Sequence, residues 1–317
     1  METISLVLCP PVGRRRDVNV RLAFTAALFG LIACGIVAGC GSEGPAHPGA
    51  VAVVASTDVW GSVARAVAGG HLPVKSVLTG ADADPHSYEA TAADAAAIAD
   101  ADLVVYNGGG YDPWVDRVLA AHPDIPAIDA YSLLGTVPAG QAPDEHVFYN
   151  LSVAKSVAVT IADRLATIDP PHAADYRANA AEFARGADAI ANSEHAIAAT
   201  YPATGVIATE PVVNYLLAAA GLINRTPAAF TMANENDNDP SPADVASVLD
   251  MIDHREVKAV LINPQTSSAV TNDLQAAARR AGVPVTEVTE TLPRGTDYLT
   301  WQRNTVNQLT AALRSGR

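Results

Sequence analysis

Two apolar patterns alternate along the chain after residue 50. Continuous apolar runs at Val51–Ala55 and Leu103–Tyr106 are typical of strands that are buried on both faces of a parallel sheet. Between them, Asp58–Ala68 repeats valine at every fourth position, which is the spacing of an amphipathic helix. Strands and helices therefore alternate, and this order predicts parallel sheets built from strand–helix–strand units.

The same reasoning places the remaining elements. A capping box from Thr91 to Asp94 and the sequence Ser241-Pro242-Ala243-Asp244 each mark the start of a helix, and Pro211 suits the first turn of another. Further strands are expected at residues 74–78, 206–208, 259–262 and 283–288, and further helices at residues 267–281 and 297–315.

The middle of the chain carries a purely helical pattern. One helix ends at Pro170-Pro171, and a second is expected over Ala173–Ala199. Large apolar residues recur every seven positions along the second helix, at Tyr176, Phe183, Ile190 and Ile197. A coiled coil is the alternative, but the stripe lasts only about three heptads and lacks flanking charge pairs. A long helix lying across two lobes accounts for it better.

The predicted fold class is therefore α/β. We expect two lobes, each with a parallel-type sheet flanked by helices, joined by one long rigid helix. The expected boundaries are residues 51–170 for the N-terminal lobe, 171–200 for the linking helix and 201–317 for the C-terminal lobe.

The first forty residues are typical of an export signal. Four arginines between positions 14 and 21 precede the apolar stretch Leu22–Val37, and Val37-Ala38-Gly39-Cys40 resembles a bacterial lipobox. The resemblance implies cleavage before Cys40 and lipid attachment to it. Residues 1–39 are then a lipoprotein signal peptide, and residues 40–50 are a flexible tether.

A membrane-spanning helix is the alternative for this segment, but sixteen apolar residues fall short of the ~20 that such a helix needs. Export through the general secretory route is expected, because Asp17 directly follows the paired arginines that a twin-arginine signal would use. The expected location is therefore the outer face of the cytoplasmic membrane, with Cys40 as the lipid anchor.

Cysteine content and charge narrow the chemistry of the exported part. Cys9 and Cys34 fall within the signal and Cys40 is consumed by lipid, so neither a disulfide nor a thiolate ligand is expected. Residues 1–39 carry four arginines and two acids, so their net charge is +2 and the rest of the chain carries −16 (−14 − 2). This acidity argues against a nucleic-acid partner. A metal site would have to use His, Asp and Glu.

Four short motifs occur in order along the chain. They are Asp84-Pro85-His86-Ser87-Tyr88-Glu89, Asn107-Gly108 with Pro113-Trp114, Asp144-Glu145-His146-Val147, and Asp239-Pro240-Ser241-Pro242. As an ordered set they resemble the motifs of the solute-binding lipoproteins of zinc- and manganese-type ABC importers, the periplasmic solute-binding protein family 9. The likeness runs from about Val51 to the C-terminus.

This resemblance implies a metal site with two histidines, His86 and His146, and two carboxylates, Glu210 and Glu290. Glu210 fills a position that is His or Glu in the family. Glu290 stands where the family usually has Asp, and Glu287 is its nearest rival. Two neutral imidazoles and two carboxylates balance the charge of one divalent ion, which limits the free-energy cost of burying it.

The ligand set alone leaves the metal open between Zn²⁺ and Mn²⁺, with Fe²⁺ also possible. Many zinc-specific members of the family carry a histidine-rich loop before the second ligand. Residues 133–144 occupy that place and contain no histidine, which weakens the case for zinc. The six remaining histidines lack a motif and are expected to be solvated: His47, His71, His122, His172, His195 and His254.

The function that the resemblance implies is capture of the metal between the two lobes and delivery to an ABC permease and its ATPase, by a monomer that is not an enzyme. A metal-dependent hydrolase using the same ligands is the first alternative, but four protein ligands would close the position that catalytic water needs. A surface adhesin is the second alternative, and no repeat or low-complexity arm supports it.

The long helix leads to a prediction about domain motion. We expect it to restrict the hinge, so that metal capture moves local loops and tilts the lobes without wide closure. Solution scattering of the metal-free and metal-loaded protein should then give nearly equal radii of gyration. A large decrease on loading would contradict this hypothesis.

Overall fold

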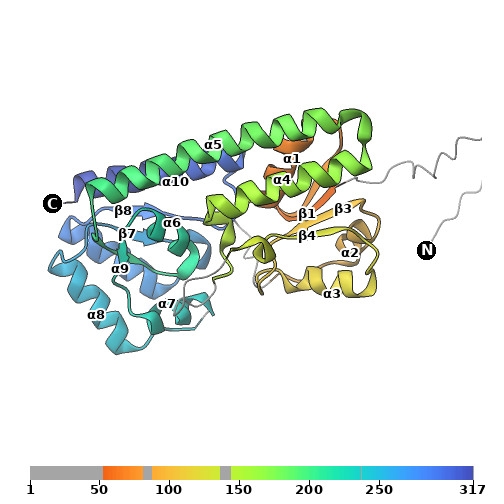
Figure 1. Ribbon diagram of the computed structural model, residues 1–317. Coiled ribbons are helices and arrows are strands. Elements are labelled where there is room, and N and C mark those ends of the chain that lie inside the picture. Colours follow the sequence, from red (N-terminus) through yellow and green to blue (C-terminus); the bar gives the residue numbers. More distant parts are fainter. Residues whose placement is uncertain (1–52, 81–87, 136–143, 237, 317) are drawn as a thin grey trace, which may run out of the picture. The chain divides into compact units, whose positions relative to one another are not determined.

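The computed structural model describes residues 53–80, 88–135, 144–236 and 238–316. Two four-stranded parallel sheets form its framework (Figure 1). The first has the order β2-β1-β3-β4 and the second the order β6-β5-β7-β8, so each begins its chain path at an interior strand. The strands of the first sheet are β1 Val53–Thr57, β2 Val74–Leu78, β3 Leu103–Tyr106 and β4 Ala127–Asp129. Those of the second are β5 Gly205–Ala208, β6 Ile223–Asn224, β7 Val260–Ile262 and β8 Val285–Glu287.

Helices cover both faces of each sheet (Figure 1). Those that follow the first three strands are α1 Asp58–Ala68, α2 Ala92–Ala99 and α3 Pro113–Ala121. The central pair is α4 Leu151–Ile168 and α5 Ala173–Thr200. The remaining helices are α6 Asn214–Ala219, α7 Ala228–Glu235, α8 Pro242–Asp253, α9 Ala269–Ala281 and α10 Tyr298–Ser315. The predicted fold class, two parallel sheets flanked by helices and connected by a long helix, is confirmed.

Buried strands explain the continuous apolar runs in the sequence. Val53 and Ala55 of β1 face one core cluster together with α1 and α4, whereas Val54 faces a second cluster that contains Ile98 of α2 and Trp114 of α3. Both faces of the strand are therefore apolar, as the side-chain alternation of a covered sheet requires.

The 28-residue helix α5 lies along both lobes (Figure 1). It packs against α1 and α4 on the side of the first sheet and against α6 and α10 on the side of the second. Its predicted stripe is buried at all four positions: Tyr176, Phe183, Ile190 and Ile197. One hydrophobic cluster runs from Val53 in the first sheet to Leu313 in the last helix, so both lobes share a core along α5. The exact lobe boundaries stay a prediction.

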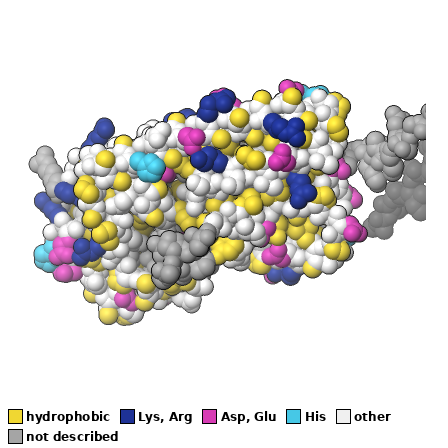
Figure 2. All heavy atoms as spheres, in the orientation of Figure 1, with side chains coloured by type: hydrophobic (Ala, Val, Ile, Leu, Met, Phe, Trp, Pro, Cys, Tyr) yellow, Lys and Arg dark blue, Asp and Glu magenta, His cyan; other side chains and the backbone are white. Residues whose placement is uncertain are grey.

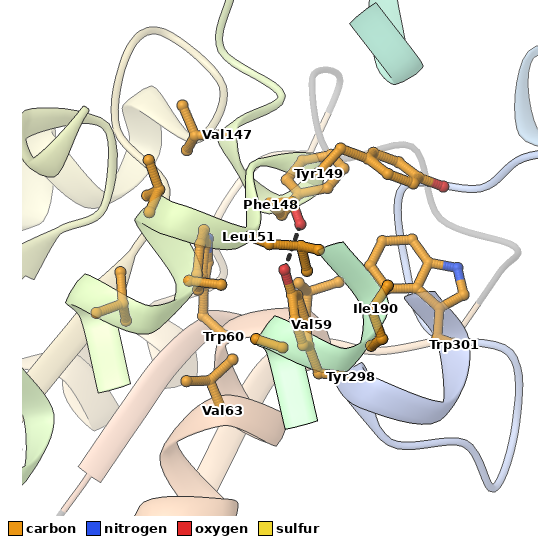
Figure 3. Packing of buried hydrophobic residues seen from close by; sticks show 14 of the residues in the cluster. Val59, Trp60, Val63, Val147, Phe148, Tyr149, Leu151, Ile190, Tyr298 and Trp301 are labelled. Atoms are coloured by element: carbon orange, nitrogen blue, oxygen red, sulfur yellow. Dashed lines mark hydrogen bonds between the residues drawn. The ribbon is translucent and has the colours of Figure 1, made fainter. Parts of the chain in front are cut away.

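An aromatic group joins the two lobes beneath this helix (Figure 3). The ring centroids of Tyr149 and Trp301 lie 5.0 Å apart, and those of Phe148 and Trp301 lie 6.2 Å apart. Tyr298 Oη donates a hydrogen bond of 2.7 Å to the carbonyl oxygen of Phe148. Gln302 Nε2 donates to the same oxygen at 3.1 Å. Helix α10 therefore holds the turn that follows His146.

Four elements were not predicted: helix α3, strand β4, strand β6 and helix α7. Strand β6 is two residues long, and α7 spans only eight, so neither carries enough of a repeat to be recognised. The starts of two helices could be predicted because a side chain caps each of them. Thr91 and Asp94 form the expected capping box, and the Ser241 hydroxyl accepts a hydrogen bond from the Asp244 N–H at 3.1 Å.

The surface that Figure 2 shows has Lys and Arg side chains interspersed with Asp and Glu, so the net acidity does not gather into one patch on this face. Within the described residues, every helix is too short or too polar to cross a membrane. The predicted signal peptide, tether and lipidated Cys40 lie outside the described residues.

Helix α5 also buries a carboxyl group that does not belong to the apolar stripe. Glu194 is 3% exposed, and its Oε1 has no hydrogen-bond partner in the described part of the chain. Burial raises the pKa of Glu194 from 4.5 to about 7, because a charged carboxylate loses hydration there. Between pH 4.5 and a pH of about 7, the folded protein therefore keeps a proton on Glu194 that the unfolded chain releases.

This burial predicts a pH-dependent stability. The contribution of Glu194 to the free energy of unfolding is present at low pH and is lost as the pH rises from about 4.5 to about 7. The free energy of unfolding of Glu194→Gln should not fall over this pH range. At pH 8 the variant should be more stable than the unmodified protein by on the order of 3 kcal/mol. Urea unfolding at pH 5 and pH 8 measures the difference. Glu182→Gln, exposed on the same helix, is the matched control, and equal pH slopes in all three proteins would refute the prediction.

Candidate metal centre

The candidate centre lies where strands of both sheets end. Glu210 follows β5 by two residues, Asn263 directly follows β7, and Glu290 follows β8 by three. Because parallel strands end at the same edge of a sheet, these side chains converge there. His146 reaches them from the connection between β4 and α4.

His146 is fully buried and is oriented by its own loop. Its Nδ1 lies 2.7 Å from Asp144 Oδ1, which also accepts the His146 backbone N–H at 3.0 Å. A neutral imidazole that donates a hydrogen bond through Nδ1 carries its lone pair on Nε2. The contact with Asp144 therefore makes Nε2 the nitrogen that can bind a metal. Asp144 Oδ2 accepts a hydrogen bond of 2.8 Å from Asn214 Nδ2 of the second lobe.

Asn107 holds this loop against the end of β3. Its Nδ2 donates to the carbonyl oxygen of Glu145 at 2.8 Å, and its Oδ1 accepts from Trp60 Nε1 at 3.1 Å. Gly108 follows at φ +71°, where a Cβ would lie 2.0 Å from Asp129 Oδ1, so only glycine fits. The Asn107-Gly108 motif thus positions His146. The chain turns at Gly109-Gly110.

Two carboxylates face His146 Nε2. Glu235 Oε1 lies 3.3 Å from it and Glu290 Oε2 lies 3.7 Å from it. Glu290 is 2% exposed, and its Oε1 accepts a hydrogen bond of 2.8 Å from Asn263 Nδ2. The rival residue Glu287 is exposed on β8, so of the two acids Glu290 is the one beside the histidine.

Glu210 adds a third carboxyl group to the same region. It is 3% exposed, and Thr266 Oγ1 donates a hydrogen bond to its Oε1, while Oε2 has no hydrogen-bond partner among the described residues. Burial raises the pKa of Glu210 to about 7. Hydrogen bonds from Thr266 and Asn263 oppose that shift, and the charges of Glu290 and Glu235 add to it.

The electrostatics of the cluster favour a cation. Burial alone would lower the pKa of His146, but its hydrogen bonds with Asp144 and Glu235 raise it well above the usual 6.5. Glu235 and Glu290 lie near His146 Nε2, and their charges also act on Glu210. The three carboxyl groups repel one another unless protons or a metal ion compensate them. Asp144, Glu145 and His146 also bring three ligand atoms within 4.8 Å of one another.

The other predicted ligand, His86, lies outside the described residues, as does most of its motif. The segment that carries it begins beside the centre. The carbonyl oxygen of Gly80, the last residue described before it, accepts a hydrogen bond of 3.0 Å from Thr291 Oγ1. Thr291 is the neighbour of Glu290 in the chain.

The structure places a further carboxylate, that of Glu235, beside the predicted ligand His146. No motif marks Glu235, and it ends a helix that the sequence pattern did not indicate. Its physical signal appears only once that helix is known. An acidic side chain at the carboxyl end of a helix opposes the helix dipole, and it is retained there more readily when a cation or a donor faces it.

Among the described residues, the recorded partners of the other histidines do not include the residues of the centre. His122, His195 and His254 are exposed, as expected, and His47 lies outside the described residues. The rings of His71 and His172 stack with centroids 4.0 Å apart, and His71 Nε2 lies 3.2 Å from Asp175 Oδ2.

Comparison with known proteins finds relatives that are named for metal uptake or metal binding. The family model described as ZnuA, Zinc-uptake complex component A periplasmic, matches residues 53–312. The manganese-binding lipoprotein MntA of Halalkalibacterium halodurans is 24% identical over 266 residues, which cover 80% of this chain and 86% of that protein. The structure of the periplasmic zinc binding protein TroA from Treponema pallidum superposes with a TM-score of 0.69 at 18% identity, covering 82% of this chain and 98% of that one. The solute-binding protein FpvC from Pseudomonas aeruginosa, solved in complex with Mn²⁺, gives a TM-score of 0.68 at 23% identity, covering 83% of this chain and 98% of that one.

The raised pKa values predict that protons compete with a metal. Glu210, with a pKa of about 7, and His146, with a pKa above its usual value, both carry protons at pH 6 that a metal has to displace. The apparent affinity for Mn²⁺ should therefore fall about tenfold or more from pH 8 to pH 6. Calorimetry in buffers of different ionisation enthalpy should also register proton release. Equal affinity at both pH values, without proton release, would count against this reading of the centre.

Proposed function

Because this chain belongs to the family described as Zinc-uptake complex component A periplasmic, we propose that it captures one divalent transition-metal ion outside the cytoplasmic membrane and delivers it to an ABC-type importer. The prediction of family membership is confirmed by the match over residues 53–312. The observation that carries the proposal is the buried group of His146, in the connection between β4 and α4, with Glu210 and Glu290, which follow strands of the second sheet.

We assign four ligands to the ion: His86, His146, Glu210 and Glu290. Asp144 orients His146, and Asn263 donates to the Glu290 oxygen that does not face the histidine. Such outer hydrogen bonds fix the direction of a ligand and raise its basicity. The assignment of His86 is supported by the hydrogen bond from Thr291 to Gly80, which starts the His86 segment beside Glu290.

The cargo is an ion of the Zn²⁺, Mn²⁺ and Fe²⁺ class. Imidazole nitrogen and carboxylate oxygen suit all three ions, and thiolate is missing from the proposed ligand set. The names of two relatives agree with this class of ions, since one is named for manganese and the other for zinc. The site is proposed to bind the ion without catalysing a reaction, because four protein ligands fill the tetrahedral positions of an ion such as Zn²⁺ and leave none for a reacting water.

The proposed setting is a lipid-anchored monomer. Cys40 carries the lipid, residues 40–50 form the tether, and the lobes present the ion to the permease and its ATPase. The MntA relative is itself named a lipoprotein. A tether of this kind holds the protein near its permease and raises the local concentration of the cargo.

Binding is proposed to act on contacts that already cross between the lobes. Tyr215 Oη donates to the carbonyl oxygen of Asp144 at 2.8 Å, and Tyr149 Oη donates to that of Thr289 at 2.9 Å. Both contacts flank the residues assigned as ligands. An ion that pulls His146, Glu210 and Glu290 together therefore adjusts these loops, and the permease can read the loaded state there.

Calorimetric titration tests the proposal. The full chain, purified in detergent and stripped of metal, should bind Zn²⁺ or Mn²⁺ with one-to-one stoichiometry. His86→Ala, His146→Ala and Glu290→Ala should each weaken binding by about tenfold or more, whereas the exposed His122→Ala should not change it. Failure of folded, metal-free protein to bind any of the three ions would overturn the proposal.

A further inference from the structure

We infer that Glu235 is a further ligand of the metal and makes the centre selective for ions that accept many oxygen ligands, such as Mn²⁺, over four-coordinate Zn²⁺. This inference rests on the proposed function. It concerns a residue that lies outside the four-ligand set and outside the motifs that define that set.

The position of Glu235 is the first argument. Its carboxylate is 8% exposed, and its Oε1 lies 3.3 Å from His146 Nε2, closer than the 3.7 Å of Glu290 Oε2. Asp144 directs this same nitrogen toward the ion. An ion bound to Nε2 at about 2 Å would lie within a small side-chain adjustment of Glu235 Oε1.

The second argument is that the fold holds Glu235 in place. Asn234 Nδ2, on the preceding residue, donates a hydrogen bond of 3.0 Å to the carbonyl oxygen of Thr209. Thr209 directly precedes Glu210, so α7 is tied to the backbone beside another ligand. Phe230 anchors the helix in the core of the second lobe with no exposed surface.

The third argument is electrostatic. Glu235 ends its helix, where a carboxylate is unfavourable, and it lies near Glu210 and Glu290, whose charges repel it. Glu210 contributes a second signal, because its Oε2 is buried and has no hydrogen-bond partner among the described residues. A divalent cation would offset the repulsion because it attracts all three carboxylates, and it would also bind the buried Glu210 Oε2.

Selectivity follows from the ligand count. Added to the four ligands of the proposed function, Glu235 raises the number of donor atoms to at least five and gives the occupied centre a net charge of −1. The number is larger if a carboxylate binds through both oxygens. Zn²⁺ prefers four ligands in a tetrahedron, whereas Mn²⁺ accepts six, mostly oxygen. Because the intrinsic affinity order places zinc above manganese, discrimination has to come from geometry, and Glu235 supplies it.

Glu235→Gln in the full chain in detergent tests the inference. It keeps the size of the side chain and removes one charge. Glu287→Gln is the matched control, since it removes one charge from the same lobe at an exposed position of β8. Dissociation constants for Mn²⁺ and Zn²⁺ are measured by chelator competition, and the electron paramagnetic resonance spectrum of bound Mn²⁺ reports its coordination directly.

Glu235→Gln should weaken Mn²⁺ binding by about tenfold or more, weaken Zn²⁺ binding less, and alter the Mn²⁺ spectrum, while Glu287→Gln changes none of these. Unchanged or tighter Mn²⁺ binding, or equal losses for the two ions with an unchanged spectrum, would overturn the inference and leave the proposed function intact. Failure of the unmodified chain to bind either ion would instead remove the proposed function itself.

Discussion

The hydrogen bond between Asp144 Oδ1 and His146 Nδ1, 2.7 Å long, is the contact on which the centre depends. It fixes which ring nitrogen meets the carboxylates and holds the ring in one orientation. The other oxygen of Asp144 accepts from Asn214 across the lobes, so one side chain both aims the histidine and connects the two halves of the molecule. Burial raises the pKa of Asp144, but the hydrogen bonds and charge of His146 together with the hydrogen bond from Asn214 bring it below its usual value, so the carboxylate stays ionised.

The architecture around this contact leaves little freedom for independent lobe movement. Helix α5 buries large apolar side chains against helices of both lobes, and the aromatic residues Phe148, Tyr149 and Trp301 pack in the same core. Separating the lobes would expose this shared core, at a cost that grows with the apolar area exposed.

The sequence predicted the framework well, since its signals are local. The heptad stripe of α5, the capping box at Thr91 and the cap at Ser241 depend on residues close together in the chain, and the structure contains all three. Glu210 and Glu290 were placed by resemblance and lie together near His146. Glu235 was missed because α7 is short and because the role of its last residue arises only from a contact with a distant loop. His86 stays a prediction, since its segment lies outside the described residues.

The contacts of helix α10 indicate the order in which parts of the chain fold. The carbonyl oxygen of Phe148 accepts hydrogen bonds from Tyr298 and Gln302, residues 150 and 154 positions later in the chain. Contacts of such long sequence separation form late, because a large loop has to close first. In a chain synthesised from its N-terminus, His146 therefore appears long before the residues that support it. The last helix fastens the loop that carries His146, and the centre becomes rigid only once the entire chain has folded.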